Sequence, residues 1–418
     1  MTQEELFSAA LGIQSPWYIE AINLDLPKGE LNITVNFKRG SKFEYVDKQT
    51  GETGEYKAYD TQEKKWRHMN FFQYRCYLHA RIPRVKLGDG KIKQVKAPWE
   101  GVAHGFTLLF EALIMQFAKV MPVHQICQMV GTYDYKVWDI IQRYTQTCRE
   151  LSDYSDVKQV GMDETAARRG HDYVTLFVDM QEKKTLFVTE GKSSETTKDF
   201  VVDLQEHGGE AQNIEQVSCD MSPAFIKGVE ENLPMADITF DKFHIIKIIN
   251  KAVDQVRKQE VKTNPMLKDS KFVFLKNQIN YTVKQKEKYQ SISMSKLNIK
   301  TFRALRIREA FQQIYLCDNK ESFEPLLNKW YFWATHCRIP QIIEVAKTIK
   351  RHWKGVLNWA NSRITNGILE GFNSIFQAAK AKARGYKKTE TIKAIIYLLT
   401  AKLDFSQVNH YCSTHSLL

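Results

Sequence analysis

Short alternating runs of apolar and polar residues fill the first hundred positions and predict β-strands. The runs AINLDL, LNITVNF and KFEYV lie within residues 17–46 and are broken by KGE and RGS. Two further strands are predicted around residues 66–78 and 81–95, with Gly88-Asp89-Gly90 as turn residues. We therefore expect residues 1–99 to form a small β-rich module.

The spacing of apolar residues becomes helical from His104 onward. One stripe of the predicted helix carries Phe106, Leu109, Phe110, Ile114, Phe117 and Met121. A short helix, VHQICQMVG, then ends in Gly131, and a second amphipathic helix, YKVWDIIQRYTQTCREL, follows it. This order predicts a helix-turn-helix region over residues 100–150, with Lys136 and Arg143 as DNA contacts. Helical hairpins also occur in bundles that bind no DNA, and the pattern alone leaves that alternative open.

Residues 151–250 alternate between strand and helix in a defined order. Strands are predicted in VKQVGMDE, DYVTLFVDM, KTLFVTEG, IEQVSCD and ADITFD, and helices in SSETTKDFVVDLQEHG, SPAFIKGVEENLP and FHIIKIINKAVDQVRKQE. Three sequential strands followed by alternating helix and strand describe an α/β fold with a ribonuclease H-like core. We expect this segment to be the first part of that core.

The rest of the chain is predicted to be helical. Residues 251–345 show no strand pattern and are interrupted by Pro265, Pro325 and Pro340, which predicts a basic helical insertion within the core. Residues 346–418 are predicted to hold two further helices and to form the C-terminal part of the core.

Composition narrows the class of protein. The chain is 43% hydrophobic and 12% aromatic, which excludes a disordered chain. No window offers the roughly 18 uninterrupted apolar residues of a membrane span, and MTQEELFSAALG lacks the features of a signal peptide. Seven scattered cysteines predict reduced, buried thiols and support neither a disulfide framework nor a zinc site. We expect a cytoplasmic, nucleoid-associated protein.

Charge is distributed unevenly along the chain. The total is +12, and residues 151–250 carry −9 whereas residues 251–350 carry +11 and residues 351–418 carry +7. A basic surface attracts phosphate backbones, and metal-dependent nucleases combine such a surface with an acidic centre. DNA or RNA is therefore the predicted partner class. A merely soluble, Lys-rich helical region is the alternative that charge alone leaves open.

Two aspartates end predicted strands of the core. Asp163 ends the first strand and Asp220 the fourth. In a ribonuclease H-like sheet these strands are neighbours, so the two carboxylates converge at one end. Convergent carboxylates are costly unless a cation binds, and oxygen ligands of this kind suit Mg²⁺ or Mn²⁺. For either residue alone, the alternative is a turn former or a helix cap.

A third carboxylate comes from a predicted helix in the segment ITNGILEGFNSIFQAAKAKARGY. Its polar face carries Asn366, Glu370, Asn373, Gln377, Lys380 and Arg384. One carboxylate between amides suits a metal ligand, with Asn366 and Asn373 as supporting residues. Further along, Lys380, Lys382 and Arg384 are predicted to contact backbone phosphates.

Several strings together carry a family resemblance. They are VGMDETAARRGHDYVTLFVDM, CDMSPAFIKGV, FDKFHIIKIIN and RITNGILEGFNSIFQAAKAKARGY, with WRHMNFFQYRCYLHARIPRV and KAPWE in the N-terminal part. The sequence resembles transposases of bacterial insertion sequences with an Asp-Asp-Glu triad, of the ISL-three group. The resemblance implies that Asp163, Asp220 and Glu370 are the triad and bind the catalytic metal ions. It also implies cleavage of DNA at the element's ends and joining of the freed 3′-hydroxyls to target DNA.

Two further features follow from this resemblance. The string FDKFH resembles an Asp-x-x-His signature, which matches Asp241 and His244 and implies a supporting role; a plain core histidine is the alternative for His244. Members of the group usually carry an N-terminal zinc ribbon, but the corresponding stretches, FEYVDKQTG and RVKLGDGKIKQV, contain no cysteine. We therefore expect no zinc, and a module held by packing of Trp66, Phe71, Phe72 and Trp99.

The predicted function is thus a DNA transposase. Its predicted partners are double-stranded DNA, namely the element's terminal inverted repeats and the target, and at least one further copy of the chain on DNA. One alternative is a ribonuclease H-like nuclease or resolvase, which uses the same triad without joining strands. Another is a transposase-derived DNA-binding protein that no longer cuts, against which the retention of all three acids argues.

Overall fold

The computed structural model describes residues 2–46, 53–168, 170, 172–293, 299–317 and 320–413. The chain divides into two compact units, which are described separately. The first unit comprises Met1–Ser152 together with Phe376–Leu418, and the second comprises Asp153–Ile375. Part of the cysteine-free stretch 43–51, and Arg169 and His171 of the first family string, lie outside the described residues.

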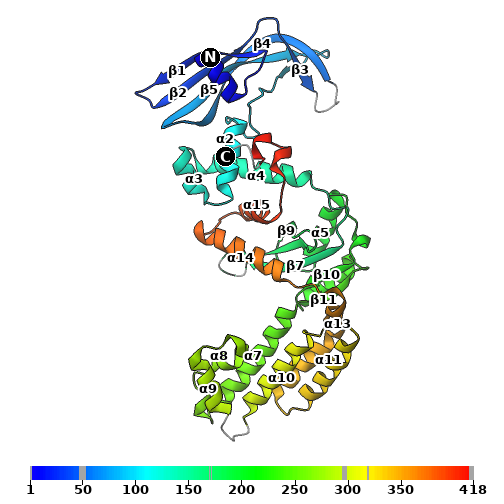
Figure 1. Ribbon diagram of the computed structural model, residues 1–418. Helices are drawn as coiled ribbons and strands as arrows, with labels where there is room; N and C mark the ends of the chain where they lie inside the picture. Colours follow the sequence, from blue (N-terminus) through cyan, green and yellow to red (C-terminus); the bar gives the residue numbers. More distant parts are fainter. Residues whose placement is uncertain are drawn as a thin grey trace. The chain divides into compact units, whose positions relative to one another are not determined.

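The first unit begins with a mostly antiparallel sheet. Its elements are α1 (Gln3–Leu11), β1 (Trp17–Asp25), β2 (Glu30–Phe37), β3 (Lys42–Val46), β4 (Thr53–Phe71), β5 (Tyr74–Lys86) and β6 (Ile92–Gln94). The strand order is β1-β2-β5-β4-β3, and β6 pairs with β5 (Figure 1). Side chains alternate between buried and exposed along β2 and β5, so one face forms a core and the other stays polar. The predicted β-rich module is confirmed.

Two details of the predicted module are wrong. The β4–β5 turn falls at Phe72-Gln73, and β5 runs through positions 79 and 80, where a strand boundary was predicted. Phe72 is 80% exposed because it adopts a positive φ of 51° in this tight turn, which turns it away from the core. Trp66 and Trp99 are buried as expected, with ring centroids 5.8 Å apart.

Helices complete the first unit. They are α2 (Leu108–Ala118), α3 (Val123–Val130), α4 (Asp134–Glu150) and α15 (Thr389–Thr400), followed by the short helices η4 (Phe405–Gln407) and η5 (His410–Cys412). Thr107 caps α2, and Gly131 ends α3 in the left-handed conformation with φ of 67°. The C-terminal segment packs on the same helices, because the Asn409 amide donates to the Leu108 carbonyl and to the Tyr144 hydroxyl, both at 2.7 Å.

The second unit is built on a five-stranded sheet. Its strands are β7 (Gln159–Ala166), β8 (Tyr173–Asp179), β9 (Lys184–Glu190), β10 (Gln216–Cys219) and β11 (Asp237–Phe240), in the order β11-β10-β7-β8-β9. The strands β7, β8 and β9 are antiparallel neighbours, and β10 lies parallel to both β7 and β11. The helices between the strands are α5 (Glu195–Glu206) and α6 (Pro223–Asn232), and α7 (Lys242–Glu260) follows β11. The predicted element order and the pairing of the first and fourth strands are confirmed.

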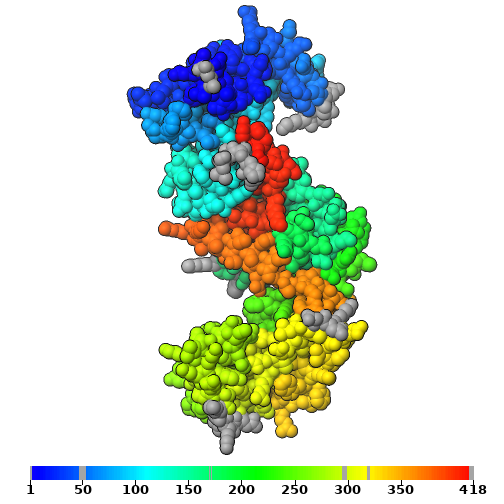
Figure 2. All heavy atoms as spheres, in the orientation of Figure 1, coloured from blue at the N-terminus to red at the C-terminus, as the bar shows by residue number. Residues whose placement is uncertain are grey.

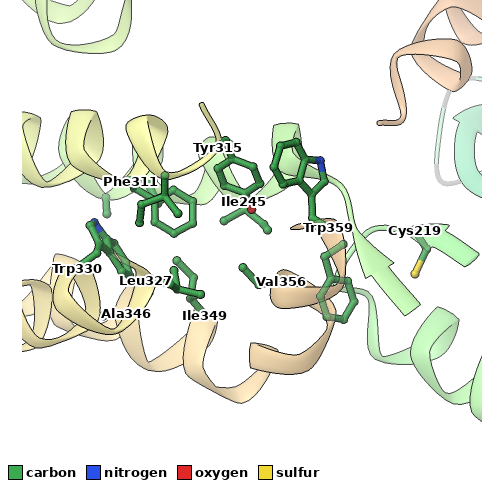
Figure 3. Close-up of a cluster of buried hydrophobic side chains, with 14 of the residues drawn as sticks. Cys219, Ile245, Phe311, Tyr315, Leu327, Trp330, Ala346, Ile349, Val356 and Trp359 are labelled. Atoms are coloured by element: carbon green, nitrogen blue, oxygen red, sulfur yellow. The ribbon is translucent and has the colours of Figure 1, made fainter. Parts of the chain in front are cut away.

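A helical insertion follows α7. It contains α8 (Lys271–Leu275), α9 (Val283–Ser293), α10 (Lys300–Ile314), α11 (Lys320–Thr335) and α12 (Pro340–Arg351), with the short helices η2 (Pro265–Leu267) and η3 (Gln278–Asn280). Three helices follow it instead of the predicted two: α13 (Trp353–Ser362), α14 (Gly367–Lys382) and α15. Figure 3 shows that insertion residues such as Phe311 and Trp330 share one hydrophobic cluster with Ile245 and Trp359, so the insertion is anchored to α7 and α13.

All seven cysteines are free thiols, and six of them are buried whereas Cys317 is partly exposed. Within the described residues, none of the helices combines the length and the apolar character needed to cross a membrane.

Candidate active site

Asp163 lies in β7, the central strand of the second sheet. The preceding Val160, Gly161 and Met162 are fully buried, which fixes the strand in the core. The Asp163 carboxylate accepts the backbone N–H of Glu164 at 2.8 Å on one oxygen and the Asn373 side-chain amide at 2.9 Å on the other. Asp163 is therefore held from its own strand and from α14.

Asp220 follows β10 directly. Its carboxylate accepts the backbone N–H of Ser222 at 2.8 Å, which forms the turn that leads into α6 with Pro223 at the first helical position. The turn-forming role that sequence left open is thus present. It occupies one oxygen of the carboxylate, so the second oxygen remains available for another role.

The registers of three parallel strands align three aspartates. Ser218 of β10 pairs with Gly161 of β7, and Cys219 pairs with Phe240 of β11. Continuing each register beyond its last pair brings Asp220 level with Asp163 on one side and with Asp241 on the other. Carboxyl ends of adjacent parallel strands are where open α/β sheets bind ligands.

Asp241 and His244 form a hydrogen-bonded pair at this sheet edge. Asp241 is only 2% exposed and begins α7. Its Oδ2 lies 3.2 Å from Nδ1 of His244, and its Oδ1 accepts a long hydrogen bond of 3.4 Å from the backbone N–H of Asn366. Both residues influence the charge of the neighbouring strand ends, because Asp241 raises the pKa of Asp163 and His244 lowers it.

Electrostatics in the site shift two pKa values upward. The pKa of Asp163 rises to about 6, chiefly because the carboxyl is buried, and Asp220 and Asp241 raise it further. The N–H of Glu164 and the His244 side chain oppose this rise. The pKa of His244 is raised mainly by its hydrogen bond to Asp241, with Asp163 and Asp220 adding to the effect. The site therefore concentrates negative charge that favours bound cations.

Helix α14 and Asn366, the residue before it, contact all three strand ends. Asn366 is 1% exposed and accepts the Ser218 hydroxyl at 2.6 Å. Two turns later, Asn373 donates to Asp163. Glu370 lies between these two contacts, one turn after Asn366, whose carbonyl accepts its backbone N–H at 2.9 Å. The Glu370 side chain is exposed.

Close packing sets the approach of α14 to the sheet. A Cβ atom placed on Gly161 would lie 2.8 Å from Cδ1 of Leu369 and 2.4 Å from Sδ of Met180. The absence of a side chain at Gly161 thus lets the helix lie directly on β7. A glycine inside a strand is a known sign of close backbone approach, and this signal was available in the string VGMDE. The role of Ser218 had no comparable signal.

Unpaired polar atoms remain in the site. Among the described residues, Nδ2 of Asn366 and Oδ1 of Asn373 are buried and have no hydrogen-bond partner. The same part of the chain holds no group of three His, Cys, Asp or Glu side chains arranged to bind a metal ion. Asp163, Asp220, Asp241 and His244 are brought together, whereas Glu370 stands on the adjoining helix.

Comparison with known proteins identifies the family. A family model described as a transposase, of the ISL3 type with a DDE motif, matches residues 160–396, which include Asp163, Asp220 and Glu370. The chain belongs to the ISL3 family of transposases. It is 26% identical over 349 residues to the transposase for insertion sequence element IS1001 of Bordetella parapertussis, covering 80% of this chain and 83% of that one. It is 24% identical over 368 residues to that of IS1557 of Mycobacterium tuberculosis, covering 81% and 82%.

The predicted DNA contacts of the transposase lie in the first unit. Lys136 places its ammonium 5.4 Å from the Phe106 ring, and Arg143 donates to Asp139 at 2.8 Å. Lys380 lies over Phe376 at 5.8 Å. The two remaining candidates, Lys382 and Arg384, are exposed around the C-terminal end of α14. These residues stay predictions, and the first two are partly engaged by neighbours.

Proposed function

We propose that Asp163, Asp220 and Glu370 form the catalytic triad of this transposase, for metal-dependent cleavage at the ends of its insertion sequence and strand transfer to target DNA. The observation that supports this most is the alignment of Asp163 and Asp220 at neighbouring strand ends, with the Glu370 helix tied to both β7 and β10. The fold we assign to residues 153–250 and 346–375 is the ribonuclease H-like core, with residues 251–345 as its insertion. The rest of the predicted C-terminal part of the core, from Phe376 onward, lies in the first unit instead.

The donor set fits Mg²⁺ or Mn²⁺. The available groups are carboxylate oxygens and the unpaired amide oxygen of Asn373, which are hard ligands of the kind these ions take. Burial is the main cause of the raised pKa of Asp163, and Asp220 and Asp241 raise it further; a divalent ion would relieve the repulsion among these carboxylates. Glu370 would complete the ligand set when ions and DNA phosphate bind, because its side chain is exposed on α14. Bound ions would neutralise the scissile phosphate and activate the attacking oxygen.

Other residues of the site act through the triad. Asn373 orients Asp163, and Ser218 and Asp241 hold Asn366 at the start of the helix that carries Glu370. The pKa of His244 is raised by its hydrogen bond to Asp241, and by Asp163 and Asp220, so His244 affects the charge in the site. We assign His244 and Asp241 a supporting role beside the scissile phosphate.

DNA recognition is assigned to the first unit. We propose that α3 and α4, joined at Gly131, form a helix-turn-helix that binds the terminal repeats. Lys380, Lys382 and Arg384 would contact backbone phosphates. Two ends must be brought together for transposition, so the active form on DNA is at least a dimer.

A plasmid assay tests the triad. The protein is incubated with Mg²⁺ and a supercoiled plasmid that carries the element's two ends, and cleaved and joined products are separated on a gel. We expect cleavage at the ends and transfer by the parent, and neither by Asp163→Asn, Asp220→Asn or Glu370→Gln. Glu344→Gln, an exposed glutamate of α12, is the matched control and should retain both reactions.

The outcomes separate the alternatives. Cleavage without joined products would favour a nuclease or resolvase. Specific binding without any cleavage by the parent would favour a DNA-binding protein. Cleavage that persists in Asp163→Asn would remove the catalytic assignment.

A further inference from the structure

A buried arginine joins the N-terminal sheet to the helices that follow it. Arg67 lies in β4 and is 7% exposed. Its guanidinium donates to the carbonyls of His68 and of Cys76, the latter at 3.1 Å, and to the carbonyl of Val130 at 3.2 Å. Val130 is the last residue of α3, so Arg67 also places a positive charge at the negative end of that helix. One side chain therefore fixes the sheet and the end of α3 together.

Backbone contacts reinforce this joint. The N–H of Arg67 donates to the Gly105 carbonyl at 2.8 Å, and the N–H of Thr107 donates to the Arg67 carbonyl at 3.1 Å. Next to them, Nδ1 of His68 lies 2.8 Å from the Thr107 hydroxyl, which also caps α2. Both segments belong to the first unit, whose blue and cyan parts adjoin in Figure 2. Buried hydrogen bonds thus join the sheet to α2 and α3.

Three exposed side chains lie in or beside the segment that joins α3 to α4. The Arg75 side chain of β5 lies against Gly131 in the turn, with Cδ 3.9 Å from where a Cβ would be. Tyr133 and Tyr135 flank the start of α4, each 68% exposed, with nearly parallel rings 6.0 Å apart. Among the described residues, the Arg75 guanidinium has no ion pair and neither tyrosine hydroxyl has a hydrogen-bond partner. Lys136 and Arg143, by contrast, are already engaged.

Net charge indicates what the sheet contributes to DNA binding. Residues 101–150 carry no net charge, whereas residues 51–100 carry +5. The helices alone therefore offer little attraction to a phosphate backbone, and the β4–β5 part of the sheet supplies it. In a helix-turn-helix, the first residues of the second helix reach base edges, which is where Tyr135 stands.

We propose that Tyr133, Tyr135 and Arg75 form one contact surface for duplex DNA, in which the two tyrosines discriminate sequence and Arg75 binds phosphate. Arg67 is the positioning residue: by bonding to the sheet and to the end of α3, it keeps Arg75 and the two tyrosines in fixed positions for binding the duplex. The tyrosine rings offer flat apolar faces for thymine methyl groups and sugars. This proposal rests on the proposed function in taking α3 and α4 as a helix-turn-helix and the element's ends as the DNA that is recognised.

Binding measurements test the proposal on the full chain. The probes are a fluorescent duplex carrying the terminal inverted repeat and a shuffled duplex of equal composition, without Mg²⁺. We expect Tyr133→Ala and Tyr135→Ala each to lower the affinity ratio between the two duplexes roughly tenfold, and Arg75→Ala to reduce the salt-dependence slope by about one for both duplexes. Phe332→Ala, an aromatic residue of the second unit that is 66% exposed, is the matched control and should change neither quantity.

Two outcomes overturn the proposal. One is an unchanged affinity ratio and slope in all three variants. The other is a tyrosine variant whose affinity ratio is unchanged but whose DNA-free dimer becomes a monomer. That result would make the surface a contact between two copies of the chain. The proposed function is judged independently, because Asp163→Asn should bind both duplexes like the parent and yet fail to cleave. Arg67→Met should lower the affinity ratio while retaining the parent's far-UV circular dichroism, and a parent-like ratio would count against the positioning role.

Discussion

The side-chain amide of Asn373 donates a hydrogen bond of 2.9 Å to Oδ2 of Asp163 across 210 residues of sequence. This bond links α14 to the central strand of the second sheet. It leaves the amide oxygen of Asn373 unpaired beside the carboxylate. The helix that carries Glu370 is thereby tied to the aspartate with which Glu370 is proposed to act.

Removing this amide should impair catalysis more than binding. Asn373→Ala leaves Asp163 without its partner on α14, and loss of such outer contacts typically costs roughly 10- to 100-fold in activity or metal affinity. We expect a slower cleavage rate at saturating DNA and a higher Mg²⁺ requirement, with DNA affinity unchanged. Ser374→Ala, the exposed neighbour on the same helix, is the control. An Asn373→Ala variant with parental rate and Mg²⁺ requirement would contradict the positioning role.

The raised pKa of Asp163 predicts how stability depends on pH. Because the pKa rises from 3.8 to about 6 on folding, the folded chain binds the proton more tightly than the unfolded chain. Without metal, the free energy of unfolding should therefore fall as pH rises through this interval and stay lower above it. Asp163→Asn removes the effect and should stabilise the chain at neutral pH by on the order of 1 to 3 kcal/mol.

Urea denaturation at about pH 5 and about pH 8 measures this effect. The stability gain of Asp163→Asn over the parent should be larger at the higher pH. Added Mg²⁺ should stabilise the parent and have less effect on the variant, because a ligand stabilises only the state that binds it. A gain that is the same at both pH values would contradict the assigned cause.

A third prediction concerns the C-terminal segment of the first unit. Asn409 is 2% exposed and donates to the Leu108 carbonyl and the Tyr144 hydroxyl, and that hydroxyl donates in turn to the buried Glu111 at 2.8 Å. Asn409→Ala leaves the buried Tyr144 hydroxyl without its donor and removes the bond to the Leu108 carbonyl, which should lower the free energy of unfolding by about 1–3 kcal/mol. Ser406→Ala is the control, because its hydroxyl bonds only to exposed Asp404. Equal midpoints for the two variants would show that the network contributes nothing.

Much of the second unit could be predicted because hydrophobic patterning sets strand order. The buried runs of β7, β8 and β9 and the later β10 and β11 dictate which strands pair, and pairing brings Asp163 next to Asp220. Contacts that depend on side-chain geometry left no such pattern. The bond between Ser218 and Asn366 joins residues 148 positions apart, and its donor looks like any small strand residue.

In the first unit, too, the sequence pattern predicted strands but not the contacts that depend on side-chain geometry. Alternation predicted its strands, but not the turn at Phe72, because the apolar run continues through that turn. Arg67 looked like an ordinary strand cation, and only the folded chain shows that it enters the end of α3. The helix-turn-helix pattern likewise predicted Lys136 and Arg143 as DNA contacts, but not that neighbouring residues engage them.

Lys382 offers a direct test of the predicted phosphate contacts. It is exposed on the last turn of α14, near Arg384. Lys382→Ala should weaken binding to any duplex and reduce the salt-dependence slope by about one, while leaving the preference for the terminal repeat intact. Lys347→Ala, which removes a lysine from α12 in the second unit, is the charge-matched control. A slope equal to that of the control would remove Lys382 from the interface.

The contact between Gly161 and α14 gives the sharpest prediction for the site. Gly161→Ala places a methyl group 2.8 Å from Cδ1 of Leu369 and 2.4 Å from Sδ of Met180. Met180 can move at little cost, but Leu369 is fully buried and belongs to the helix that carries Glu370. The variant should lose about 1–3 kcal/mol of stability through overpacking, and its cleavage rate should fall further than this loss explains because α14 is displaced from β7.

A double variant separates these effects. Trimming Leu369 to Ala in the Gly161→Ala background makes room for the methyl group below the helix, so cleavage should recover relative to Gly161→Ala alone. Replacing Met180 by Ala in the same background removes only the close contact with Sδ of Met180. This change should restore stability but not the cleavage rate, because the contact with Leu369 of α14 remains. The non-additive term between positions 161 and 369, measured as a double-mutant cycle in cleavage rate, reports the coupling directly. If the cycle is additive, the position of α14 over Gly161 does not control the reaction.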